Sequence, residues 1–373
     1  MKINKILIVP AELRLLKYSE NLLRKSIRYF RTKLSNSRNK ENIKYNAEIN
    51  FYGDLPLILG KENVFVFGEY QDQYLSEMDP FCLYPSCQGT PEPTFVTKHE
   101  ELISILDDID AVLISSKSSA IGRKVTKLAR HKDVPVAIID RYDHEGLYLS
   151  ENIENEICRN FIYGTDYDIY FKHTYPIRFK KEHVYPICPT PIRPKSYNFK
   201  SVKKDIDFFF IGRPRADRCQ PDRAEIVNII SNNFENTHIK FDESQDNFLL
   251  PSEYHDYQSR ARFVLSPSGR VWNGSRLTEA GLAKSVLIAP KPYHHTVGPQ
   301  FRDGFNSILY DVELMEDGYH LTNKDDLLDK IQFYLNNLSK IEEIAENWYN
   351  DVLSGHTTLA RAHNLIETLQ SSL

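Results

Sequence analysis

Short apolar runs alternate with amphipathic stretches through the first half of the chain. Four of these runs have the length and composition of buried strands: residues 5–9, 64–67, 111–115 and 135–140. Between the last three runs, apolar positions recur with helical spacing over residues 99–106 and 119–131. Strands that alternate with helices predict parallel βαβ units and a right-handed, doubly wound sheet.

The middle of the chain predicts one more strand and then a connector. Residues 167–175 have the pattern of a strand. The sequence then places four prolines within ten residues: Pro186, Pro189, Pro191 and Pro194. Because proline lacks an N–H and fixes φ, this density excludes a helix or a central strand and predicts a stiff connector between two domains.

The alternation of strands and helices starts again after the connector. The second half predicts strands at 207–211, at 238–241 and at both ends of 263–290, with helices at 222–232 and 253–260. Residues 325–373 are nearly all helical in pattern. We therefore expect an α/β protein of two Rossmann-like, doubly wound domains that face each other across a cleft, with a helical C-terminal tail. The predicted boundaries are 1–195 for the N-terminal domain, 196–355 for the C-terminal domain and 356–373 for the last helix.

The stretch 263–290 has the most informative chemistry. It predicts a strand, a polar loop, a helix and a second strand, so the loop lies at the carboxyl edge of a parallel sheet, where such sheets bind ligands. The loop and the start of the helix carry five polar side chains: Arg270, Asn273, Ser275, Arg276 and Glu279. Two arginines beside the N–H groups of a helix start suit a diphosphate, and a carboxylate one turn later suits a ribose diol. The combination predicts a nucleotide-sugar pocket; in the alternative, Arg276 and Glu279 form a surface ion pair.

A second set of cations follows the strand at 207–211. Gly212, Arg213 and Arg215 come directly after it and are candidates for binding phosphate, although an ordinary strand-to-helix turn has the same composition. Departure of a nucleotide diphosphate requires positive charge, which a metal or arginines supply. The Asp-X-Asp sequence at 205–207 begins before its strand and lies at the opposite edge. We therefore expect neither a metal nor a cofactor, with the nucleotide sugar as co-substrate.

The candidate catalytic base lies in the N-terminal half. Four polar side chains follow the apolar run 136–139: Asp140, Asp143, His144 and Glu145. They are expected at the carboxyl end of a strand, on the side of the cleft. Attack by a hydroxyl group needs one carboxylate or imidazole to remove the proton of that hydroxyl. Asp143 is the first choice and His144 the second; in the alternative, Asp140 caps the next element and the others are solvated.

Three further groups are weaker candidates: Lys172 with His173, His294 with His295, and Asp303 with Gly304 and Asn306. We expect the lysine and histidine of the first pair either to act in catalysis or simply to lie at the edge of the sheet. The paired histidines contact the sugar or lie on a loop. The aspartate, glycine and asparagine form a donor-side contact or a turn, for which they are intrinsically suited.

Composition limits the partners and the location that we expect. A net charge of −4 gives no global attraction to nucleic acid. No apolar run approaches the ~20 residues of a membrane helix, and the apolar stretch 6–10 is too short for a secretory signal. The five cysteines are odd in number and scattered, so we expect reduced thiols, no zinc site and a cytoplasmic protein. Residues 13–40 predict a basic amphipathic helix that packs on the sheet or makes a peripheral contact with the inner face of the membrane.

The chain resembles glycosyltransferases of the GT-B fold, in the group with exostosin-like and CgeB-like C-terminal domains. Four segments carry the resemblance: DFFFIGRPRADR at 207–218, SPSGRVWNGSRLTEAGLAKSVLIAP at 266–290, the loop DGFNSILYD at 303–311, and SGHTTLARAHNLI in the terminal helix. The resemblance implies a nucleotide sugar on the C-terminal domain, with Arg276 at the diphosphate and Glu279 at the ribose, and an acceptor on the N-terminal domain. Many retaining members carry two glutamates eight positions apart here, whereas this chain has Val271, so we expect an inverting mechanism.

The predicted function is therefore that of a metal-independent glycosyltransferase, hexosyl- or related. It moves a sugar from a nucleotide-sugar donor to a glycan, lipid-linked or related acceptor. Two alternatives use the same pocket. A nucleotide-sugar 2-epimerase-like enzyme would convert a sugar nucleotide without an acceptor, and a non-catalytic nucleotide-sugar or glycan binding protein would bind the donor without transfer or hydrolysis.

Overall fold

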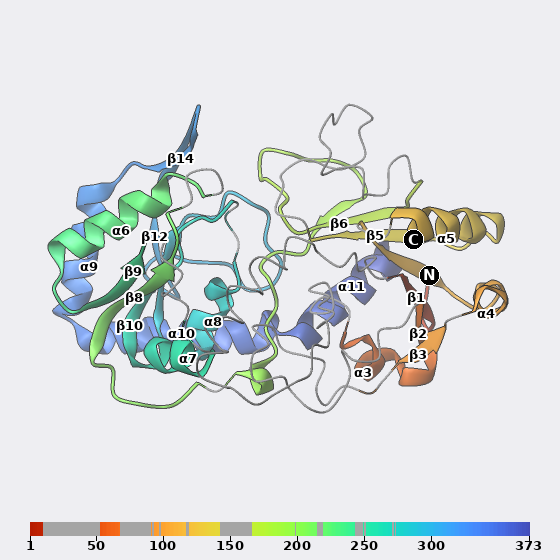
Figure 1. The fold of residues 1–373 in the computed structure, drawn as a ribbon, viewed down its shortest axis with the longest axis horizontal. Helices are drawn as coiled ribbons and strands as arrows, with labels where there is room; N and C mark the ends of the chain where they lie inside the picture. Colours follow the sequence, from red (N-terminus) through yellow and green to blue (C-terminus); the bar gives the residue numbers. More distant parts are fainter. Residues whose placement is uncertain are drawn as a thin grey trace, which may run out of the picture.

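The structure is a computed structural model of the chain. It describes residues 1–9, 53–67, 91, 93–96, 98–116, 119–141, 166–197, 199–214, 219–242, 249, 251–270, 272 and 274–373. Two parallel β-sheets, each with helices, dominate the described residues (Figure 1). The expected α/β class with two doubly wound sheets and a helical C-terminal region is thus confirmed.

The N-terminal sheet has seven strands in the order β3-β2-β1-β4-β5-β6-β7, and all neighbouring pairs are parallel. The strands are β1 (Ile6–Val9), β2 (Val64–Phe67), β3 (Thr94–Val96), β4 (Ala111–Ser115), β5 (Val136–Asp140), β6 (Ile169–Lys172) and β7 (Val184–Pro186). The helices described with this sheet are α3 (Leu55–Leu59), α4 (His99–Ile105) and α5 (Ser119–His131). Strands buried on both faces have no polar side to alternate, which is why their sequences are continuous apolar runs.

The proline-rich segment begins with a strand that the sequence did not indicate. Strand β7 ends at Pro186 and pairs with β6 at one edge of the sheet, where the missing N–H of a proline is tolerated. Because β7 pairs with β6, β6 is not the edge strand, and the prediction that Lys172 and His173 lie at the edge of the sheet is wrong. Strand β6 also ends at Lys172, earlier than the expected strand at 167–175.

The C-terminal sheet has five parallel strands in the order β12-β11-β10-β8-β9. These are β8 (Ile206–Gly212), β9 (Thr237–Phe241), β10 (Ala261–Leu265), β11 (Val286–Pro290) and β12 (Ile308–Tyr310), and a hairpin follows, made of β13 (Val312–Met315) and β14 (Gly318–Leu321). Strand β12 corrects the expectation that 303–311 is a loop throughout. The chain leaves β8 toward β9 and then returns to β10 on the other side of β8. This reversal creates a topological switch point at the carboxyl ends of β8 and β10, where open sheets bind ligands.

Helices cover both faces of the C-terminal sheet. One apolar cluster joins the sheet to α6 (Asp222–Asn233) and α9 (Lys324–Leu335). Another joins it to α8 (Arg276–Leu282) and α10 (Leu338–Gly355), and the partly buried Tyr254 and Tyr257 of α7 (Pro251–Arg260) pack against that cluster. Both clusters draw on β8, so successive phenylalanines of this strand, Phe208 and Phe209, are buried on opposite faces.

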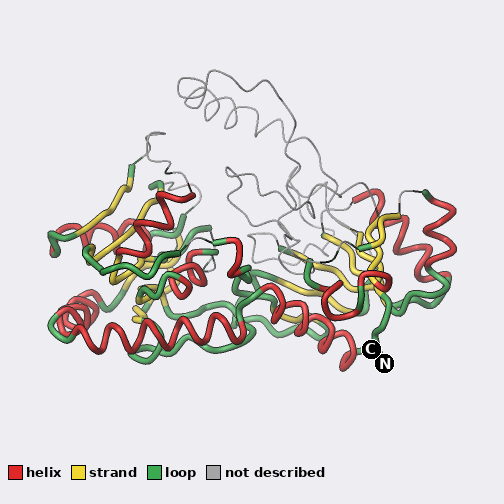
Figure 2. The backbone as a smooth tube through the Cα atoms, turned by 90° about the horizontal axis from the view of Figure 1, so that it is seen from below, coloured by secondary structure: helices red, strands yellow, loops and turns green. Residues whose placement is uncertain are grey.

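The last helix returns to the N-terminal sheet. Helix α11 (Thr358–Ser372) continues the direction of α10 and reaches the region of both chain ends (Figures 1 and 2). Its buried face contributes Leu365 and Leu369 to the same core as Ile6 and Ile8 of β1. A buried aspartate also bridges the segments, because Asp54 accepts hydrogen bonds from Arg193 and, at 2.5 Å, from the hydroxyl of Thr358. The helical tail is therefore part of the N-terminal core.

A second set of contacts links the loops after β6 and β11. The N–H of Ile177 donates to the carbonyl of Tyr293 at 3.0 Å, and the N–H of His295 donates to the carbonyl of Tyr175 at 2.7 Å. Pro176 and His294 form an antiparallel bridge between these hydrogen bonds. The carboxyl-end loops of the two sheets are thus in direct contact at this point.

Candidate functional site

The first turn of α8 brings together three of the predicted donor-binding residues. Ser275, Arg276 and Glu279 lie beside the carboxyl end of β8, at the switch point of the C-terminal sheet. Glu279 is buried, with 8% of its surface exposed. The alternative of a surface ion pair between Arg276 and Glu279 is therefore wrong.

The Glu279 carboxylate is surrounded by hydrogen-bond donors. It accepts from the hydroxyl of Ser275, the amide of Gln258 and the hydroxyl of Tyr254. Burial raises the pKa of Glu279, while these donors and the charge of Arg276 act in the opposite direction. A carboxylate in this setting is a well-placed acceptor for one more hydroxyl group.

Arg276 is fixed by contacts that join three elements. Its Nη2 donates to the carbonyl of Ile211 at 2.8 Å, and its Nε donates to the hydroxyl of Tyr254 at 3.1 Å. Its guanidinium carbon lies 4.6 Å from the ring centroid of Phe210, close enough for a cation–π interaction. These contacts hold a positive charge at the end of β8.

Gly212 is required by the same packing. A Cβ at this position would lie 2.6 Å from the ring of Phe210, the ring on which Arg276 rests. A larger residue would displace that ring, and Arg276 with it. The predicted donor-binding residues Gly212 and Arg276 therefore both lie against the ring of Phe210.

The remaining predicted donor-binding residues are described only in part. Arg213 follows Gly212 and is half-buried, and Arg270 is exposed after β10. Gln220 links the two segments, because its side-chain amide donates to the carbonyl of Arg270 at 2.8 Å. Arg215 and Asn273 lie outside the described residues, as do the base candidates Asp143 and His144, Glu145, and the predicted helix 13–40.

The described base candidate, Asp140, lies at the carboxyl end of β5, as predicted. It is fully buried, and its carboxylate accepts from three side chains: Ser116 at 3.2 Å, Tyr170 at 2.7 Å and Lys172 at 2.8 Å. This network joins the ends of β4, β5 and β6. The backbone carbonyl of Asp140 also accepts the N–H of His173 at 2.9 Å, so the network holds the start of the next loop.

The histidine candidates lie where the two halves of the chain meet. The Nε2 of His173 is 3.0 Å from the hydroxyl of Thr190 in the proline-rich connector. Burial lowers the pKa of His173 well below its usual value, and the nearby positive groups, Arg141 first, lower it further. His294 is buried and His295 hydrogen-bonds to the carbonyl of Phe179, so both lie on the loop that contacts the N-terminal half.

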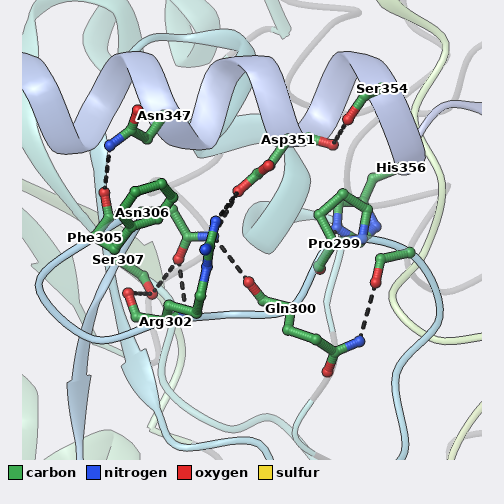
Figure 3. Close-up of polar contacts among 11 residues, drawn as sticks. Pro299, Gln300, Arg302, Phe305, Asn306, Ser307, Asn347, Asp351, Ser354 and His356 are labelled. Carbon is green, nitrogen blue, oxygen red and sulfur yellow. Dashed lines mark hydrogen bonds and ion pairs between the residues drawn. The ribbon is translucent and has the colours of Figure 1, made fainter.

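Asp303, Gly304 and Asn306 form a turn. Asn306 hydrogen-bonds from this turn to α10 (Figure 3). The side-chain amide of Asn306 donates to Asp351 of α10 at 2.7 Å and to the carbonyl of Gln300 at 2.9 Å. The carboxylate of Asp303 accepts from the N–H of Leu309 at 2.8 Å. Gly304 has a φ of +71°, which favours glycine. These contacts support the turn and give no support to a donor-side role.

The Asp-X-Asp segment 205–207 lies at the amino end of β8, as predicted. Asp205 precedes β8 and forms a two-pronged ion pair with Arg260, with distances of 2.9 and 2.7 Å. Asp207 is paired with Arg262. Both carboxylates are thus at the amino end of the sheet, opposite the switch point. Among the described residues, no group of three His, Cys, Asp or Glu side chains is arranged to hold a metal ion.

Two residues of the site were not identified from the sequence. Tyr254 and Gln258 lie four positions apart on α7, so they share a face, and both reach Glu279. The helical spacing of 253–260 was visible in the sequence. What the sequence did not indicate is that this face lies against the start of α8.

Asp222 is a third missed residue of the same sheet edge. It begins α6 and is fully buried, and its Oδ2 accepts from the hydroxyl of Tyr310 at 2.7 Å and from the N–H and hydroxyl of Ser268. Among the described residues, its Oδ1 has no hydrogen-bond partner. Burial raises the pKa of Asp222 to about 6, against the hydrogen bonds from Tyr310 and Ser268, which lower it.

Comparison with known protein families gives a match over the C-terminal part of the chain. Residues 221–367 match the family model described as "Glycosyl transferase-like". The match begins at the start of α6 and includes α7, α8 and Glu279. Residues 221–367 are thus similar to glycosyl transferases. This confirms the resemblance to GT-B glycosyltransferases that the four sequence segments indicated.

A solved structure of one other protein has a similar fold over nearly the whole chain. The Anabaena protein Alr3699/HepE, in complex with UDP and glucose, has a TM-score of 0.50 and 10% sequence identity. The alignment covers 98% of this chain and 99% of that one. An alpha-glucosyltransferase, in complex with UDP-glucose and DNA containing an abasic site, has a TM-score of 0.47 and 11% identity over 97% of this chain and 99% of that one. At 10% identity the similarity to HepE shows the fold alone.

The remaining comparisons add two findings. The search of curated protein sequences gives no match to this chain. Among the described helices, none has the length and apolar character needed to span a membrane.

Replacing Asp222 by Asn is predicted to reduce the pH dependence of stability in the glycosyl transferase-like domain. The pKa of Asp222 is raised from 3.8 to about 6 in the folded protein, so the folded state holds the proton more tightly than the unfolded state. This group therefore lowers the free energy of unfolding as the pH rises from about 4 to about 6, by up to roughly 3 kcal/mol. In Asp222→Asn this decrease should be absent, and denaturant unfolding at pH 4 and pH 7 measures it.

Asp325, an exposed carboxylate in the first turn of α9, provides the matched control. Asp325→Asn should follow the wild-type pH dependence. The assignment of Asp222 is wrong if the stability difference between Asp222→Asn and the wild type is the same at both pH values.

Proposed function

We propose that this protein is a glycosyltransferase that moves a sugar from a nucleotide-sugar donor to a glycan or related acceptor. The observation that carries the proposal is the pairing of Arg276 with the buried Glu279 at the switch point of a glycosyl transferase-like domain. A nucleotide sugar has a diol and a diphosphate within one molecule, and this pair offers an acceptor for the first and a cation for the second.

The proposed chemistry is a displacement at the anomeric carbon. The acceptor oxygen forms the new bond to this carbon, and the bond to the donor phosphate breaks with its electron pair going to the departing diphosphate. Arg276 and Arg213, with Arg215 and Arg270, are the proposed sources of positive charge for this leaving group. We propose that no metal ion is required and that the reaction inverts the anomeric centre.

The proposed base remains Asp143, with His144 as the second choice. Both follow β5 in the sequence, and Asp140, which ends β5, lies at the carboxyl edge of the N-terminal sheet. One of them would take the proton of the acceptor hydroxyl as its oxygen attacks. The acceptor, a cytoplasmic location and a membrane contact through residues 13–40 are further parts of the proposal.

The first nucleotide to test is UDP. The structure of HepE, whose fold matches this chain over nearly its full length, contains UDP and glucose. A 2-epimerase-like enzyme or a non-catalytic binding protein would also bind such a ligand. Only a transferase requires a second substrate to consume the donor rapidly, so the products formed with and without acceptor separate the three functions.

Replacing Glu279 by Ala is predicted to weaken donor binding with the fold intact. Loss of a hydrogen bond to a charged group costs about 1.5–3 kcal/mol, which corresponds to roughly 10- to 150-fold in the dissociation constant. Calorimetric titration with UDP and UDP-sugars measures this change, and slow donor hydrolysis should fall in parallel. Glu342→Ala, at an exposed glutamate of α10, is the control and should bind as the wild type does. Unchanged donor affinity in Glu279→Ala would refute the assignment of the pocket.

Activity is predicted to survive EDTA. The arginines around Arg276 provide the positive charge that a divalent ion supplies in metal-dependent transferases. The rate of donor consumption is measured after exhaustive chelation and again after addition of Mg²⁺ or Mn²⁺. Loss of activity on chelation with recovery on adding either ion would contradict the proposed stabilisation of the leaving group.

A further inference from the structure

We propose that Tyr254 is the positioning residue of the donor site. Its hydroxyl joins the carboxylate proposed to bind the ribose with the guanidinium proposed to face the diphosphate, so both halves of the nucleotide depend on one phenol. This inference rests on the proposed function and extends it to a residue of a different helix.

The geometry of Tyr254 places one oxygen between two functional groups. Its hydroxyl accepts from Nε of Arg276 at 3.1 Å and from the side-chain amide of Gln258 at 3.3 Å, and it hydrogen-bonds to Glu279. Its ring lies edge-on to Phe209, with the centroids 5.2 Å apart. The ring is therefore held by the sheet while the hydroxyl reaches α8.

The direction of each hydrogen bond follows from the chemistry of the partners. The guanidinium of Arg276 and the NH₂ group of Gln258 can only donate, so they use the lone pairs of the phenol oxygen. The one proton of the phenol is then directed to Glu279. A positive donor on the same oxygen polarises the O–H bond and strengthens its hydrogen bond to the carboxylate. Arg276 thereby strengthens the hydrogen bond that Tyr254 donates to Glu279.

The protonation state of Tyr254 supports a fixed role as donor. Burial raises the pKa of Tyr254 to about 12, so the phenol keeps its proton at neutral pH. The charged groups that face it are Arg276 and Glu279, both on α8. Because the phenol keeps its proton, Glu279 is the member of this pair whose charge changes on acidification, and burial raises its pKa.

The hydrogen-bonding capacity of Glu279 limits what the ligand can add. An ionised carboxylate has about four lone-pair positions. Ser275, Gln258 and Tyr254 occupy about three of them, which leaves room for a donor hydroxyl from one ribose oxygen. Without the phenol, the carboxylate would lose a donor from α7 and with it part of the restraint on its orientation.

The test is the variant Tyr254→Phe, with Tyr257→Phe as the matched control. Tyr257 lies one turn further along α7, and its ring stacks on His238 at a centroid distance of 3.8 Å. Calorimetry with UDP, GDP and ADP at several pH values gives the dissociation constant of the best nucleotide for each variant. We expect Tyr254→Phe to bind it about tenfold more weakly, as for loss of a hydrogen bond to a charged group. Tyr257→Phe should bind as the wild type does.

The pH profile distinguishes positioning from mere packing. A carboxylate that loses a donor has a higher pKa, so in Tyr254→Phe the loss of binding on acidification should begin at a higher pH than in the wild type. Tyr254→Phe should weaken binding less in the Glu279→Ala background than in the wild type, because the part of its effect that acts through that carboxylate is lost and only the part that acts through Arg276 remains.

The outcomes separate this inference from the proposed function. If the wild type binds none of the three nucleotides, the donor site fails and the role of Tyr254 fails with it. If the wild type binds but Tyr254→Phe matches it in affinity and pH profile, only the role of Tyr254 is refuted. An undiminished effect of Tyr254→Phe in the Glu279→Ala background would also refute it.

Discussion

A buried carboxylate next to a fixed guanidinium is the constraint around which the donor half of this protein is organised. Burying Glu279 disfavours its charged form, so the fold must supply hydrogen-bond donors to it. Those donors come from α7 and from the start of α8. Arg276 links the same group to β8, because it donates to the carbonyl of Ile211. Strand, helix and loop are thus fixed relative to one another by polar contacts before any ligand arrives. Such preorganisation is what a site for a charged nucleotide requires.

The second organising feature is the return of the chain to its first sheet. Helix α10 packs through Trp348 on α8, and α11 then places Leu365 and Leu369 in the N-terminal core. The N–H of Thr358 donates to the carbonyl of Ile192, which ties the start of α11 to the proline-rich connector. Two passages of the chain therefore join the halves, one through the connector and one through α11. The helix that packs on α8 and the helix that completes the N-terminal core, α10 and α11, are consecutive in the sequence.

Much of the architecture could be predicted from the sequence because its strands are buried on both faces. The runs at 64–67 and 111–115 match β2 and β4 at both ends, and the helix at 119–131 matches α5. The proline density at 186–194 correctly excluded a central strand there, since β7, which ends at Pro186, lies at the edge of its sheet. The prediction missed β7, since a proline at the end of an edge strand needs no donor on its outer side. Strand β12 was missed because a short apolar run beside turn residues has the pattern of a loop.

The site was only partly predictable for a different reason. Spacing within one segment indicated Arg276 and Glu279, because both lie on one short helix. Tyr254, Gln258 and Asp222 reach the site from other helices, and no local pattern specifies which distant element a helix face will contact. Asp222 begins α6 and yet is fully buried, since Ser268 and Tyr310 enclose it.

The central claim is that the carboxyl edge of the C-terminal sheet binds a nucleotide sugar, and a ligand panel tests it most directly. Thermal unfolding of the intact chain is measured with increasing amounts of UDP-, GDP-, ADP-, dTDP- and CMP-sugars. A ligand that binds only the folded state raises the unfolding temperature in a concentration-dependent way. We predict a saturating rise with at least one of these sugars and a smaller rise for the same ligand in Glu279→Ala. No rise with any member of the panel, at concentrations well above the millimolar range, would contradict the account.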